Sequence, residues 1–235
     1  MKEIPTSGQS ETADMATFLA SSVHDMKNSV SLLISGLEKT LASTSPESLP
    51  TYGELSQMTY EAKRINHNLV QLLTLYKLDQ QIYPFDPQYL AVDEFLGGVA
   101  EQTASLLRSQ GMELEVDAPS ELYWPFDEDL VTGVIGNAVS NALRYTSRRV
   151  RLGARVADGF LEIRIEDDGP GYPPAMIEQT ATAQRGAGFQ TGSTGLGLHF
   201  STKVAQLHRN RSRCGDIRLE NGGAYGGGCF VLRLP

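Results

Sequence analysis

Two series of apolar residues, spaced at alternating steps of four and three, constrain the fold of this chain most strongly. Such spacing places the apolar side chains on one stripe of an α-helix. The series are Leu19, Val23, Met26, Val30, Leu33, Leu37 and Leu41, then Leu55, Met58, Ala62, Ile65, Leu69, Leu72 and Tyr76. A Ser-, Thr- and Pro-rich break separates them, so the sequence predicts an antiparallel hairpin of two helices. Because one hairpin buries each stripe only in part, we expect two copies to pair as a homodimeric four-helix bundle.

The character of the sequence changes near residue 80. The segment DQQIYPFDPQY ends the second apolar series, and its prolines disfavour continuation of a helix. Beyond it, strand-like stretches such as FLEIRIEDDG and CFVLRLP mix with helical ones such as DEDLVTGVIGNAVSNALRY. We therefore predict an α+β protein with two domains. Residues 1–80 form the helical hairpin, and residues 81–235 form an α/β sandwich in which one sheet packs against helices.

Charge and composition exclude several classes of function. The formal net charge is −8 and no basic stripe stands out, so we expect no binding of nucleic acid. The two cysteines are few for a disulfide scaffold, and the polar start MKEIPTSGQSETADM lacks the apolar core of a signal peptide. No apolar run approaches the roughly 18 to 20 residues that span a bilayer. We therefore expect a cytoplasmic protein without direct membrane insertion.

A pair of asparagines in the second domain suits a metal-bound phosphate. In GNAVSNALRYT, Asn137 and Asn141 lie four residues apart, which places both amides on one face of a helix. Amide oxygens can ligate Mg²⁺, and the following Arg144 and Tyr145 can meet phosphate oxygens. Taken alone, such a pair is more often a solvated helix face.

Two glycine-containing motifs follow. In EIRIEDDGPGYP a predicted strand runs into Asp167 and a turn, where a fixed carboxylate can accept an amino hydrogen of adenine. In TGSTGLGLHF a glycine-rich loop opens a helix, whose first backbone N–H groups suit phosphate. Each motif also has a plainer interpretation, as an acidic tight turn and as a flexible connector, so neither identifies a site by itself.

The order and separation of the three motifs resemble the N, G1 and G2 boxes of one ATP-binding fold. This fold is shared by gyrase, the heat-shock chaperone ATPases, the mismatch-repair ATPases and the sensor histidine kinases. The Asp-Gly-x-Gly turn lies about 26 residues after the Asn-bearing helix, and Gly-Leu-Gly-Leu about 28 residues further on. The histidine kinases fit best, because HDMKN in the first predicted helix is similar to their H box. The resemblance covers nearly the whole chain, to the closing GGGCFVLRLP.

In the first domain, the resemblance implies the machinery of phosphoryl transfer. His24 matches the phosphoacceptor, and Asp25 matches the residue that orients its ring and takes up a proton. Asn28 matches the position that orients water when the same domain dephosphorylates its regulator. Ser29 stands where the family usually has a proline.

In the second domain, the resemblance implies a site for Mg²⁺ and ATP. Asn141 is the expected Mg²⁺ ligand, and Asp167 is the expected partner of the adenine amino group. The other residues expected to bind nucleotide are Asn137, Arg144, Tyr145, Gly169, Gly171, Thr194, Gly195 and Gly197. The stretch from Met176 to Gln190 is expected to form the nucleotide lid.

The sequence thus predicts a protein histidine kinase of a two-component system. It would phosphorylate itself on His24 from Mg-ATP and pass the group to an aspartate on the receiver domain of a response regulator, which it would also dephosphorylate. A separate sensor or receptor protein would supply the input. Two alternatives stay open: a histidine phosphotransfer protein, which would have damaged nucleotide motifs, and a non-catalytic, nucleotide-binding dimeric scaffold, against which HDMKN argues.

Overall fold

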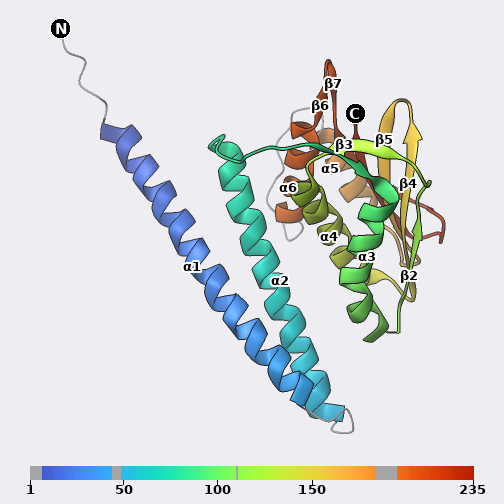
Figure 1. The fold of residues 1–235 in the computed structure, drawn as a ribbon, viewed down its shortest axis with the longest axis horizontal. Helices are drawn as coiled ribbons and strands as arrows, with labels where there is room; N and C mark the ends of the chain where they lie inside the picture. The colour runs from blue at the N-terminus through green and yellow to red at the C-terminus, as the bar shows by residue number, and fades with distance from the viewer. Residues whose placement is uncertain (1–6, 44–48, 110, 184–194) are drawn as a thin grey trace. The chain divides into compact units, whose positions relative to one another are not determined.

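The chain divides into two compact units, Met1–Tyr83 and Pro84–Pro235. The computed structural model describes residues 7–43, 49–109, 111–183 and 195–235 (Figure 1). A helical hairpin followed by a unit of mixed helices and strands confirms the fold class expected from the sequence. Within the described ranges, no helix is both long enough and apolar enough to cross a membrane.

The first unit is a hairpin of helices α1 (Ser7–Ser43) and α2 (Leu49–Asp79), which pack against each other. Val30 and Leu37 on α1 are half-buried, and Ala62 on α2 is buried. An ion pair joins the two helices, with Lys63 Nζ 2.6 Å from Glu38 Oε1. These contacts lie along one side of α1, so part of the predicted apolar stripe does close the hairpin.

The hairpin leaves a second set of apolar side chains uncovered. On α1, Met26 and Leu33 are each 55% exposed, although the heptad pattern assigns them to the same stripe as Val30. On α2, Met58, Ile65 and Leu72 are 56%, 48% and 45% exposed. Within each helix these residues are seven positions apart and therefore share one face. Contact between only two helices is too narrow to cover both sets in a single chain.

The second unit is built on a five-stranded sheet with the order β2-β4-β5-β9-β8. The strands are β2 (Glu113–Asp117), β4 (Arg149–Ala157), β5 (Phe160–Asp167), β8 (Asp216–Asn221) and β9 (Gly228–Leu234). β2 pairs parallel with β4, and the other three pairs are antiparallel. In β5 the alternate residues Leu161, Ile163 and Ile165 are buried apolar side chains, as the period of a strand requires.

Three helices cover one face of this sheet: α3 (Val92–Ser109), α4 (Glu128–Tyr145) and α6 (Gly195–Leu207) (Figure 1). A fourth, α5 (Pro174–Ala183), packs against the edge strand β8. Asp127 caps α4, because its carboxylate accepts the backbone N–H of Leu130 at 3.0 Å. Two short antiparallel pairs complete the unit: β1 (Gln88–Ala91) with β3 (Tyr123–Phe126), and β6 (Arg209–Asn210) with β7 (Arg213–Cys214).

The face of the sheet opposite the helices carries a network of ion pairs. Glu162 on β5 meets Arg155 Nη2 at 2.7 Å and Arg233 Nε at 3.2 Å. Its neighbour Arg164 meets Glu166 at 3.3 Å. Glu162 and Arg233 are only 5% and 6% exposed, so both charges are largely desolvated, and each is stabilised mainly by its ion-pair partners. Charged side chains thus cover the face of the sheet on which none of the described helices of this unit packs.

Candidate functional site

Helix α4 brings four of the predicted nucleotide-binding residues onto neighbouring turns. Asn137 and Asn141 are half-buried, while Arg144 and Tyr145 are exposed near the end of the helix. The core-facing side of α4 consists of apolar residues such as Val134. The two amides and the guanidinium therefore lie beside the packed face of α4, where a ligand can reach them.

The asparagine and Gly-Leu-Gly-Leu motifs meet where α4 packs against α6. A Cβ atom added to Gly197 would lie 2.2 Å from Asn137 Nδ2 and 2.6 Å from Asn137 Oδ1. The Asn137 amide thus occupies the space that any side chain at position 197 would need. Gly195 is the first residue of α6, and Thr194 lies outside the described residues.

Asp167 ends β5 and is held in one orientation. The side chain is 5% exposed, and its Oδ1 accepts the backbone N–H groups of Gly169 at 2.8 Å and of Gly228 at 3.1 Å. Burial, and then the negative charge of Asp167, raise the pKa of the neighbouring Tyr172 phenol, which keeps that phenol neutral. A carboxylate fixed in this way is suited to accept a hydrogen bond from a ligand in a set direction.

Two glycines outside the three predicted nucleotide motifs help to hold Asp167. A Cβ atom on Gly227 would lie 2.5 Å from the Asp167 carbonyl oxygen, and one on Gly228 would lie 2.9 Å from Asp167 Oδ2. The only sequence signal for them is the glycine run that precedes the last strand, GGGCFVLRLP. Because they have no side chain, their backbone can lie close to Asp167, about 60 positions earlier in the sequence. The spacing of the motifs does not reveal this contact.

The turn that follows Asp167 is pinned on two sides. On one side, a Cβ atom on Gly169 would lie 2.5 Å from the carbonyl oxygen of Tyr145, so the turn touches the end of α4. On the other side, Asn221 Oδ1 accepts the N–H of Tyr172 at 2.7 Å, and Asn221 Nδ2 donates to the Tyr172 carbonyl at 2.9 Å. Gly171 between them has a φ of +80°, a conformation that favours glycine. The three predicted nucleotide motifs therefore come together in this unit.

In the other unit, His24 lies on the flank of α1 with its side chain 59% exposed. Its Nδ1 atom is 3.7 Å from Asp25 Oδ1 and 3.3 Å from Asn28 Nδ2. Both neighbours lie beside the same ring nitrogen, and in the tautomer whose proton is on Nδ1 the Nε2 atom has the lone pair that can meet an incoming group. Helix α1 continues through this region, and the hydroxyl of Ser29 donates to the Asp25 carbonyl at 3.0 Å.

The donors on α4 fit Mg²⁺ only in company with a nucleotide. In the part of the chain that the structure describes, no group of three or more His, Cys, Asp or Glu residues could hold a metal by itself. Mg²⁺ is commonly bound through one or two protein oxygens together with substrate phosphates and water. The amide oxygen of Asn141, with Asn137 one turn away, supplies that kind of partial site.

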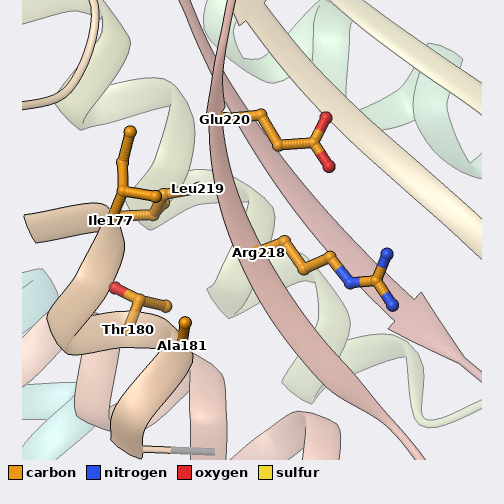
Figure 2. A pocket seen from close by; sticks show the side chains of 6 residues that line it. All are labelled: Ile177, Thr180, Ala181, Arg218, Leu219 and Glu220. Atoms are coloured by element: carbon orange, nitrogen blue, oxygen red, sulfur yellow. The ribbon is translucent and has the colours of Figure 1, made fainter. Parts of the chain in front are cut away.

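A pocket between α5 and β8 does not involve these residues. Figure 2 shows Ile177 of α5 and Leu219 of β8 pointing toward one another, while Arg218 and Glu220 extend from the other side of β8, away from α5. Thr180 and Ala181 complete the lining. Glu220 is already paired with Arg164 at 3.2 Å. The pocket thus lacks the convergent polar groups of a ligand site.

Comparison with known proteins gives a family match for the second unit. Residues 126–235 match the family described as "Histidine kinase-, DNA gyrase B-, and HSP90-like ATPase". This range contains every residue that the sequence predicts to bind nucleotide.

Sequence relatives and solved structures extend the similarity over both units. The phosphate regulon sensor protein PhoR of Pseudomonas aeruginosa is 26% identical over 85% of this chain and 46% of its own length. The sensor histidine kinase CpxA of Escherichia coli is 27% identical over 77% of this chain and 39% of its own length. The solved structure of the Acinetobacter baumannii histidine kinase AdeS shares the fold, with a TM-score of 0.57 at 18% identity over 90% of this chain and 96% of that one. The chain spans less than half the length of the first curated relatives it matches. The resemblance that the motifs indicated is confirmed.

Proposed function

We propose that this chain is the core of an ATP-dependent protein histidine kinase, because residues 126–235 match the family of histidine kinase-, DNA gyrase B- and HSP90-like ATPases. The hairpin serves dimerisation and phosphotransfer, and the second unit binds ATP. One observation carries the proposal: the motifs around Asn137, Asp167 and Gly197 converge in the second unit. The same chain presents an exposed histidine with an aspartate and an asparagine beside one of its ring nitrogens.

In the proposed site each motif has a separate task. Asp167 accepts the adenine amino hydrogen, and its two backbone hydrogen bonds fix its direction before the base arrives. Gly169 and Gly171 let the backbone approach the base. Arg144, Tyr145, Thr194 and the first residues of α6, including Gly195, contact the phosphates. Asn141 would hold Mg²⁺ together with the phosphates, and the bound ion would supply positive charge to offset that of the transferring phosphate.

His24 is the nucleophile of the proposed reaction. The Nε2 lone pair attacks the γ-phosphorus, a P–N bond forms, and the P–O bond to ADP breaks. Asp25, 3.7 Å from Nδ1, stabilises the positive charge that develops on the ring and accepts its proton. The phosphoryl group then passes to an aspartate of a receiver domain, and Asn28 orients water when that aspartyl phosphate is hydrolysed.

The exposed apolar residues of the hairpin support a homodimer. Met26 and Leu33 on α1, with Met58, Ile65 and Leu72 on α2, remain uncovered in a single chain. Burying such a surface in a four-helix bundle is favourable, because each side chain leaves water. The further partner of the proposed kinase is a response regulator. Because the phosphoryl donor is ATP, we place the reaction in the cytoplasm.

Incubation of the purified protein with γ-labelled ATP and Mg²⁺ tests the proposal. We expect the label to be acid-labile and base-stable, as a phosphohistidine is, and to be lost in His24→Gln and in Asp167→Asn. The two variants differ in nucleotide binding, which His24→Gln retains and Asp167→Asn loses. The matched control is His67→Gln, which changes another histidine of the hairpin and should label as the wild type does.

If the wild-type protein bound ATP without becoming labelled, the result would contradict the proposed kinase activity. It would favour a phosphotransfer protein or a nucleotide-binding scaffold instead.

A further inference from the structure

The carboxylate of Asp168, one residue beyond the predicted adenine partner, joins two segments of the second unit. Its Oδ1 accepts three hydrogen bonds: from the hydroxyl of Thr146 at 2.5 Å, from the N–H of Ser147 at 2.9 Å and from the N–H of Arg148 at 3.0 Å. All three donors directly follow α4. One oxygen atom therefore anchors the end of that helix to the turn after β5.

The helix end is shaped for this contact. Thr146 has an extended backbone, its N–H donates to the Ala142 carbonyl at 2.7 Å, and it is only 9% exposed. Burial by itself would raise the pKa of Asp168, but the hydrogen bonds from the Thr146 hydroxyl and the backbone N–H groups hold that pKa well below its ordinary range. Hydrogen bonds to an ionised acceptor are stronger than neutral ones.

Asp168 lies between the two halves of the proposed nucleotide site. On one side is α4, which carries Asn137 and Asn141 for Mg²⁺ and the phosphates. On the other side is Asp167, which receives the adenine. Two other contacts at this junction carry no charged group: Gly169 closely approaches the Tyr145 carbonyl, and Val150 at the start of β4 pairs with Asp167 in the sheet.

We infer that Asp168 is a positioning residue, which sets the distance between the adenine contact and the phosphate contacts. The inference rests on the proposed function, since it concerns the same site. A ligand that engages both halves gains affinity when their spacing is fixed in advance, because the second contact then costs little further ordering. A ligand that engages only one half gains nothing from that spacing.

This difference separates positioning from general stabilisation. ADP reaches both halves, whereas adenosine, which has no phosphate, reaches only the Asp167 half. Loss of the Asp168 contact should therefore weaken ADP binding and spare adenosine binding. A variant that only destabilised the second unit would weaken the binding of both ligands to the same extent.

The test measures dissociation constants for Mg-ADP by calorimetry and for adenosine by NMR titration. Asp168→Ala removes all three hydrogen bonds to the end of α4, and we expect ADP binding to weaken about tenfold and adenosine binding to stay within about twofold of wild type. Asp168→Asn keeps an acceptor oxygen and should restore part of the ADP affinity. Asp129→Asn makes the same chemical change on an exposed residue of α4 and should bind both ligands as the wild type does.

Thr146→Val keeps the shape of the buried side chain and removes only the hydroxyl donor, so it tests the same link if Asp168→Ala does not fold. It should weaken ADP binding and leave adenosine binding unchanged. The inference would be overturned if these variants bound ADP with wild-type affinity, or if they lost affinity for ADP and adenosine equally. Either result would leave the proposed function standing. If the wild-type protein binds neither ligand, the proposed nucleotide site is wrong and the inference falls with it.

Discussion

Replacing Gly197 by alanine should impair nucleotide binding while the second unit stays folded. The new Cβ atom would lie 2.2 Å from Asn137 Nδ2, about 1.2 Å closer than the shortest ordinary van der Waals distance of 3.4 Å. The obstructing atoms belong to the end of a short side chain and not to backbone. The Asn137 amide can therefore rotate away, and in doing so it leaves the position from which it would serve a ligand.

The expected change in stability is small, because two effects oppose each other. Forcing Asn137 out of its preferred rotamer costs about 0.5–1.5 kcal/mol. Alanine in place of glycine stabilises a helix such as α6 by up to about 1 kcal/mol. The free energy of unfolding should therefore stay within about 1 kcal/mol of the wild-type value.

The expected change in binding is much larger. If Asn137 contributes one hydrogen bond to a charged ligand, its displacement costs about 1.5–3 kcal/mol, or roughly 10- to 150-fold in the dissociation constant for Mg-ADP. Calorimetric titration measures this value, and denaturant unfolding measures stability in parallel. Gly98→Ala is the matched control, because that helical glycine has no heavy atom within 4 Å of an added Cβ.

A double-mutant cycle shows whether the effect passes through Asn137. In an Asn137→Ala background, Gly197→Ala should cause little additional loss, since the side chain it displaces is already absent. Wild-type affinity in Gly197→Ala would refute the reasoning. So would additive losses in the double variant.

Two further predictions concern stability. Burial lowers the pKa of His208, whose neutral ring accepts the Asp127 N–H at Nε2 over 3.0 Å. The neutral ring therefore stabilises the fold at pH values above the ordinary histidine pKa of 6.5, and this stabilisation is lost as the pH falls below 6.5. Unfolding midpoints measured from about pH 8 to pH 5 should show that loss, and His208→Gln, which cannot take up a proton, should flatten the profile. Glu162→Ala should lower the free energy of unfolding by about 3 kcal/mol, because Arg233 loses one of its partners while buried. Arg155→Ala, which removes a 60% exposed partner of the same carboxylate, should cost no more than about 1 kcal/mol, and equal losses from the two substitutions would contradict this account of the ion-pair network.

The elements with a strong local pattern could be predicted from the sequence. FLEIRIEDDG alternates apolar and charged residues, and it forms β5 with Ile163 and Ile165 buried. The pairing of β1 with β3 has no such signal, because it joins two four-residue strands that α3 and β2 separate in the sequence. The heptad pattern found both helices of the hairpin but did not show that Met26 and Leu33 remain exposed in one chain. Periodicity reports that a face is apolar and does not report what covers it.

The candidate site divides in the same way. Asn137, Asp167 and Gly197 belong to short motifs whose order along the chain carries information, so the sequence could single them out. Asp168 and Gly228 act through hydrogen bonds and close approaches to residues that are distant in sequence. Only a folded chain brings such partners together, and no spacing rule identifies them.

The location of the phosphoryl group after incubation with Mg-ATP tests the central claim most directly. Peptide mass spectrometry under neutral to basic conditions, which preserve a phosphoramidate, can assign the modified residue. The account predicts phosphate on the α1 peptide that contains His24 and on no peptide from residues 84–235. Phosphate on a serine, threonine or other histidine instead, or an unmodified His24 in a protein that binds ATP, would contradict it.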